Sequence, residues 1–154
     1  MAAKENVDGI LIEAPAKFVK EETMVSLRVP ARAGTKDARI QNPLRPNLIV
    51  HRRLAGARAD LAAVVARTRE ELARSIPGLS PVESADVAFD DGVTGVLLAY
   101  SFPAPKGLRV CQLQALRLDD GTVTSLTVTA EQSQMTEAAK KAFLRALASA
   151  SLER

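Results

Sequence analysis

An amphipathic helix in the middle of the chain restricts the possible folds more than any other feature. Between residues 60 and 78 the mainly apolar positions recur at the spacing of one helical face, at Leu61, Val64, Val65, Thr68, Leu72 and Ile76. Asp60 suits the N-cap, because its carboxylate can accept a hydrogen bond from a free backbone N–H. Pro77 and Gly78 end the helix. The apolar stripe must be buried against another element, and the β-rich remainder of the chain predicts a sheet.

The segments around this helix have the patterns of strands and tight turns. A strand containing residues 48–50 precedes the helix, and further strands are expected at residues 9–14, 23–29, 84–89, 94–102, 108–118 and 122–130. Asp-Gly pairs at 91–92 and 120–121 predict hairpin turns. A long loop is expected at residues 31–46 and a second helix at about 136–151. This order predicts an α+β fold, an antiparallel β-sheet with two main α-helices packed on it.

The length and composition indicate one soluble domain spanning residues 1–154. The net charge is only +3, the basic residues are scattered and aromatic residues make up 3% of the chain, so we expect no nucleic-acid partner. No apolar run approaches the ~20 residues of a membrane span, and the first residues lack the apolar core of a secretory signal. These features favour a cytoplasmic protein without stable membrane insertion.

Groups that perform enzyme chemistry are scarce in this sequence. His51 is the only histidine and Cys111 the only cysteine, which excludes the usual zinc ligand sets. His51 is interpreted as a structural or surface residue, and Cys111 as a small buried apolar residue. Each aspartate pair is followed by glycine, so a turn explains it better than a calcium site. There is no glycine-rich phosphate loop, and we expect no enzymatic activity, no cofactor and no metal.

Gln112 and Gln114 are one candidate binding pair. They lie on the same face of a long strand that is otherwise mostly apolar. They could occupy the solvated face of an antiparallel sheet, or they could exchange hydrogen bonds with a bound peptide. The residue pattern leaves both interpretations open.

A second candidate surface combines two strands. Val25, Leu27 and Val29 alternate with polar residues and share one face, and we group Ile49 with them. The face could be core beneath a helix, or it could form an exposed apolar groove for a partner helix.

Several segments together resemble a known family. They are PNLIVHRR, the helix ending in IPGL, GVTGVLLAYSF, GLRVCQLQALRLDDG and TVTSLTVTA before the final helix. In these patterns the chain resembles the DcrB-like family, which shares the Mog1/PsbP-like fold, over roughly residues 10–152. The motifs describe strands and turns, so they specify the fold better than the function.

Among the branches of this family, the chain resembles the Eag-type chaperones of type VI secretion in its size and in the expected lack of a leader. The resemblance implies a homodimer that binds and shields the apolar N-terminal transmembrane segments of an effector before loading onto the secretion spike. By position it implies that Val25, Leu27, Ile49 and Gln112 contact the effector. Gln114, on the same face as Gln112, completes the predicted set of partner-binding residues. Two alternatives remain: a small-molecule or lipid-binding domain, and a Mog1-like regulator that binds a small GTPase.

Overall fold

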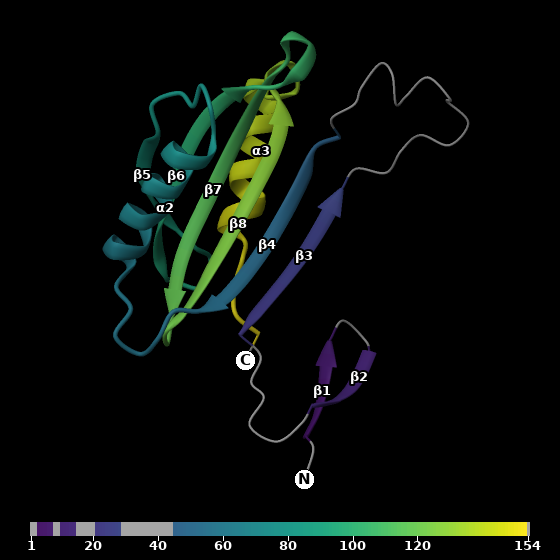
Figure 1. The fold of residues 1–154 in the computed structure, drawn as a ribbon, viewed down its shortest axis with the longest axis vertical. Coiled ribbons are helices and arrows are strands. Elements are labelled where there is room, and N and C mark those ends of the chain that lie inside the picture. The colour runs from purple at the N-terminus through teal and green to yellow at the C-terminus, as the bar shows by residue number, and fades with distance from the viewer. Residues whose placement is uncertain (1–2, 8–9, 15–20, 29–44, 154) are drawn as a thin grey trace, which may run out of the picture.

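The computed structural model describes residues 3–7, 10–14, 21–28 and 45–153. Its main feature is a six-stranded sheet with the strand order β3-β4-β8-β7-β6-β5, in which all neighbours are antiparallel (Figure 1). The strands are β3 (Glu22–Arg28), β4 (Asn47–Leu54), β5 (Glu83–Ala88), β6 (Thr94–Pro103), β7 (Arg109–Asp119) and β8 (Thr122–Glu131). With helices α2 (Leu61–Ser75) and α3 (Glu137–Ala148), this confirms the predicted α+β fold.

The remaining elements are short. The 3₁₀ helices η1 (Pro105–Gly107) and η2 (Gln132–Gln134) precede β7 and α3. The strands β1 (Ala3–Val7) and β2 (Ile10–Ala14) form a hairpin of their own, which Figure 1 shows outside the six-stranded sheet. The sequence predicted a strand over residues 9–14 but not the strand that pairs with it. The loop predicted at residues 31–46 lies outside the described residues except for its last two.

The two helices pack on opposite faces of the sheet. The α2 stripe covers one apolar cluster centred on Val64, Leu98, Tyr100, Leu116 and Val123. The second cluster lies beneath α3 and contains Phe89, Leu113, Ala115, Leu126, Val128 and Leu147. Where β7 is covered on both sides it has apolar residues at successive positions, Ala115 beneath α3 and Leu116 beneath α2.

The ends of α2 follow the predicted local chemistry. Asp60 is extended and its carboxylate accepts a 2.9 Å hydrogen bond from the backbone N–H of Ala62. Ile76 closes the helix, and Gly78 then adopts a φ of +72°, which favours glycine. Among the described residues, no helix is long and apolar enough to span a membrane.

The turn between β7 and β8 fixes the register of the two central strands. Asp120 and Gly121 both have positive φ, 47° and 78°, as a two-residue turn of type I′ requires. The Asp-Gly signal in the sequence therefore marks a true hairpin. The register that follows places Gln112 opposite Thr129 and Gln114 opposite Thr127.

Candidate partner-binding face

One face of the sheet is covered by a helix over only part of its width. Helix α2 covers β6 and the parts of β7 and β8 around Leu116 and Val123, while Figure 1 shows no described helix in front of β4 and β3. Residues directly opposite each other in a sheet share a face, so the pairing of strands identifies the side chains on this uncovered part. We call it the open face; it consists of Met24, Ser26, Arg28, Asn47, Ile49, His51, Gln112, Gln114, Ser125, Thr127 and Thr129.

Amide and hydroxyl groups form hydrogen bonds across the centre of the open face. The Nε2 atom of Gln112 donates to the hydroxyl of Thr129 at 2.9 Å, and that of Gln114 donates to the hydroxyl of Ser125 at 2.8 Å. The Tyr100 hydroxyl, beside α2, donates to Oε1 of Gln114 at 3.3 Å. These bonds hold two half-buried amides in fixed orientations. Each amide has further hydrogen-bonding capacity that a bound polypeptide could use.

Apolar and unsatisfied groups lie beside this network. Ile49 is half-buried, and Met24 on the edge strand is 63% exposed. The Oδ1 atom of Asn47 is buried and accepts no hydrogen bond from the described residues. This atom is already inaccessible at the surface, so it is not a position for a bound partner. The open face therefore offers apolar contact beside the remaining hydrogen-bonding capacity of the two amides.

The only histidine joins the two strands at the side of the open face. His51 on β4 forms a hydrogen bond with the Glu22 carboxylate on β3. This contact strengthens the attachment of β3, which has only one neighbouring strand among the described residues. Within the described part of the chain, no cluster of three or more His, Cys, Asp or Glu residues could hold a metal ion.

The five residues predicted to contact a partner fall into two groups. Ile49, Gln112 and Gln114 lie on the open face, so the prediction that the two glutamines share a face is confirmed. Val25 and Leu27 pair with Val50 and Leu48, whose side chains pack against the cluster beneath α3. The grouping of Val25 and Leu27 with Ile49 is therefore wrong.

The reason for this error is the register between β3 and β4. Ser26 lies directly opposite Ile49, so the odd-numbered residues of β3 share a face with the even-numbered residues of β4. A one-residue change of register moves every side chain to the other face, and the spacing of apolar residues within one strand does not reveal it. Val29, the third residue of the predicted face, lies outside the described residues.

Val25 and Leu27 form an apolar strip at the edge of the α3 face. They are 41% and 55% exposed, and they continue the half-buried side chains of Leu48 and Val50. Part of the predicted apolar surface is therefore exposed, but on the opposite side of the sheet from the glutamines.

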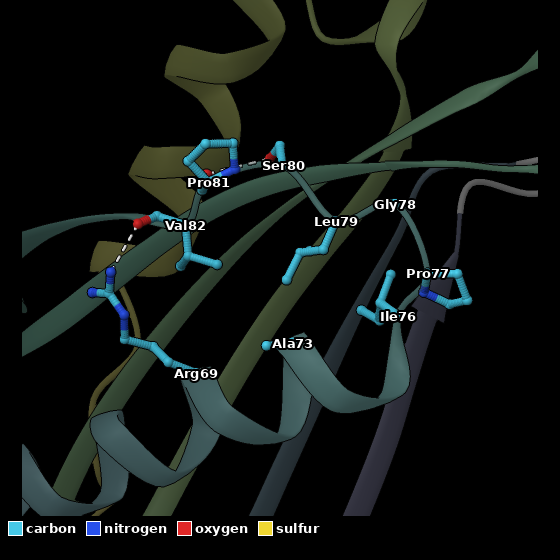
Figure 2. Close-up of a pocket in the computed structure, with 9 residues that line it drawn as sticks. All are labelled: Arg69, Ala73, Ile76, Pro77, Gly78, Leu79, Ser80, Pro81 and Val82. Atoms are coloured by element: carbon cyan, nitrogen blue, oxygen red, sulfur yellow. Dashed lines mark hydrogen bonds between the residues drawn. The ribbon is translucent and has the colours of Figure 1, made fainter.

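An open hollow lies at the C-terminal end of α2. Figure 2 shows Ile76, Leu79 and Val82 lining it, with Arg69 across from them. The hollow measures about 680 Å³, and Nη2 of Arg69 donates to the carbonyl of Val82 at 3.0 Å. A second open hollow, near Leu144 on α3, is lined mainly by the exposed start of that helix. Neither hollow contains a nucleophile paired with a base.

Sequence reasoning missed the strongest charge cluster of the structure. Arg117 is 1% exposed on the α3 face, where it bonds both oxygens of Asp91 and both oxygens of Asp119 at 2.7–3.2 Å. It also donates to the carbonyl of Ala150 at 2.9 Å and lies 4.8 Å from the centre of the Phe89 ring. We call this cluster the Arg117 clasp.

The clasp changes the acidity of its members. The hydrogen bond from Arg117 lowers the pKa of Asp91, and the hydrogen bond to Asp119 raises the pKa of Arg117. The sequence did contain a signal for this cluster. It is an arginine within a mainly apolar strand, with aspartate-containing turns before and after it. Because the clasp joins two turns to the C-terminal segment, it has a structural role.

The fold has a solved counterpart. The chain is similar to the crystal structure of PA94, a protein of unknown function from Pseudomonas aeruginosa that is described as a candidate regulator. The TM-score is 0.71 at 17% sequence identity, and the match covers 99% of this chain and 98% of PA94. A search of the curated proteins gave no match. The model of the DcrB family matches residues 38–149, which is more than half of the sequence, and the chain therefore belongs to the DcrB family.

Proposed function

We propose that this protein is a non-enzymatic adaptor that binds apolar helical segments of another protein on its open face. The observation that carries the proposal is the half-buried sheet surface between Ile49 and the two glutamines, which no described helix covers. Membership of the DcrB family and the description of PA94 as a candidate regulator support a protein-binding role in general terms.

The chemistry of the open face suits a helix that would otherwise aggregate. Covering the surface of an apolar segment stabilises it by roughly 25 cal/mol for each Å² of apolar surface removed from water. Ile49 and Met24 supply apolar contact, while Gln112 and Gln114 bond to polar side chains or carbonyls of the segment. A surface of mixed polarity remains soluble without its partner and releases the segment more readily than a fully apolar groove.

The specific role that we propose is that of a type VI secretion chaperone. In this role the protein shields the apolar N-terminal transmembrane segments of an effector in the cytoplasm until the effector is loaded onto the secretion spike. It acts as a homodimer, so that two open faces enclose one effector segment. The resemblance of this chain to Eag-type chaperones in size supports this role, together with its membership of the DcrB family.

Two matched variants test which face binds. Ile49→Gln changes the open face, whereas Leu54→Gln makes a comparable change on the same strand but on the α3 face, where Leu54 is 53% exposed. Each variant is co-expressed with the N-terminal segment of a large neighbouring-gene product that has apolar stretches of membrane-span length. We expect Ile49→Gln to weaken binding about tenfold, because part of the buried side chain is lost, and Leu54→Gln to bind almost normally.

The outcome is read by size-exclusion chromatography with light scattering. Equal retention of the segment by both variants would contradict binding on the open face. Loss of the segment with Leu54→Gln alone would instead place the contact on the α3 face. Circular dichroism of each variant without its partner controls for unfolding.

Binding of a small molecule or lipid has less structural support. The hollows at Arg69 and at Leu144 are both open to solvent, whereas ligand sites bury most of the ligand. Native mass spectrometry of the purified protein tests this alternative directly. A retained small ligand would favour it over the adaptor role.

A further inference from the structure

The two edges of the six-stranded sheet differ in how they are protected. At one edge, β5 exposes small and acidic side chains such as Ser84, Ala85 and Asp86, which discourage pairing with another strand. At the other edge, β3 exposes Met24, Val25 and Leu27, which are half of the six large apolar side chains exposed within the described residues. No described strand pairs with the outer side of β3. The β3 edge is therefore suited to pairing with a further strand.

The charges of β3 are complementary to those of a second β3 that runs in the opposite direction. Glu22 and Arg28 stand at its two ends, and Val25 stands at its centre. In an antiparallel pair centred on Val25, Glu22 of one copy lies opposite Arg28 of the partner subunit, and the same contact forms a second time by symmetry. Opposite charges that face each other across strands stabilise the pairing.

The alternation of faces selects this register. A twofold axis perpendicular to the sheet keeps both α3 faces on the same side, so that odd-numbered residues must oppose odd-numbered residues. Centring on Val25 pairs all seven residues of β3, whereas centring on Met24 or Ser26 leaves residues at the ends unpaired and loses the charge complementarity. The apolar strip of Val25 and Leu27 then continues into the same strip of the second copy.

We propose that a second copy of this chain pairs with β3 through an antiparallel, Val25-centred contact that joins two sheets into one of twelve strands. This contact specifies how the two subunits of the proposed homodimer meet. Only the use of the joined surface for effector binding rests on the proposed function. From β7 across the junction to the second β7, the open face becomes roughly 34 Å wide. That width accommodates about three helices side by side.

A charge exchange tests the contact without any effector. Glu22→Arg and Arg28→Glu each place two pairs of like charges across the junction, and we expect each to weaken dimerisation about tenfold. Arg28→Glu is the more direct of the two, because Glu22 also bonds His51 within its own subunit. The double variant Glu22→Arg/Arg28→Glu restores opposite charges and should recover most of the affinity. Glu22 and Arg28 are about 20 Å apart within one strand, so recovery requires contact between copies. Analytical ultracentrifugation of the full chain measures the dissociation constant.

A disulfide test fixes the register. In a Cys111→Ser background, Val25→Cys places two thiols at the axis with Cα atoms about 5 Å apart, which is suitable for a disulfide. Leu27→Cys is the matched control, because the two Leu27 positions would be about 13 Å apart. Mild oxidation should cross-link the Val25→Cys protein rapidly and the Leu27→Cys protein poorly.

Several results would overturn the proposed contact. They are a monomer at 100 µM, a dimer that is unaffected by either charge variant, and equal cross-linking at both cysteine positions. Failure of this contact leaves the effector-binding test intact, because Ile49→Gln is assayed independently of the dimer.

Discussion

Replacing Arg117 by methionine should destabilise the fold more than any other single change of a charged residue in the described part of the chain. Methionine keeps much of the side-chain volume, so the loss comes from the clasp and not from a large cavity. Removing one partner of a buried ion pair typically costs 3–5 kcal/mol. The Asp91 and Asp119 side chains retain 19% and 11% exposure, so water compensates in part. We therefore expect a loss of about 3 kcal/mol.

Urea unfolding followed by circular dichroism measures this loss. With a slope of roughly 2 kcal/mol per molar urea, the midpoint should fall by about 1.5 M. The matched control is Arg145→Met, because Arg145 forms a similar two-bond contact with Asp90 but is 68% exposed. Its midpoint should not change measurably, since exposed ion pairs contribute little. Equal effects of the two substitutions would refute the importance of burial in the clasp.

The clasp also predicts a pH dependence with a definite sign. The hydrogen bond from Arg117 lowers the pKa of Asp91 in the folded state below its unfolded value. This contribution to stability is therefore complete above about pH 4 and is lost as the pH falls through the folded-state pKa. Arg117→Met should show a weaker loss of stability in this acidic range, as measured by urea midpoints between pH 2 and pH 5. An unchanged acid dependence in the variant would contradict the assignment.

Three further predictions concern single residues. Gly95→Ala should cost about 2–3 kcal/mol in a urea titration, because a Cβ would lie 2.2 Å from the Leu116 carbonyl oxygen and 2.7 Å from the Phe89 ring; wild-type stability would disprove this close packing. Burial raises the pKa of Tyr100, the only tyrosine, to about 12, so its ultraviolet titration should occur near that pH and not near 10. Burial also raises the pKa of the Cys111 thiol, which should react slowly with Ellman's reagent until urea is added; rapid reaction of the folded protein would contradict this.

Much of the fold could be predicted because local chemistry determines it. The stripe of α2 and its Asp60 cap depend on residues close in sequence, and so does the Asp120-Gly121 turn. These signals are independent of the rest of the molecule. They fixed the strands from β5 to β8, their antiparallel order and the shared face of Gln112 and Gln114.

The candidate surface was harder to predict because it depends on contacts distant in sequence. The register of β3 against β4 decides whether Leu27 and Ile49 share a face, and no tight turn connects these strands to reveal that register. The Arg117 clasp likewise joins residues that are 26 and 33 positions apart. Sequence spacing gave the residue types on each strand but not the face that each would occupy.

The strand order has a consequence for synthesis on the ribosome. β4 pairs with β8, which begins 68 positions after the last residue of β4 and follows every other strand of the sheet. The β3–β4 arm therefore has no neighbouring sheet strand while α2, β5, β6 and β7 are being translated. During that interval the β4 side of the arm lacks its final partner. A chaperone that protects nascent chains should bind this segment, and ribosome stalling before residue 122 should leave Leu48 and Val50 accessible to proteases.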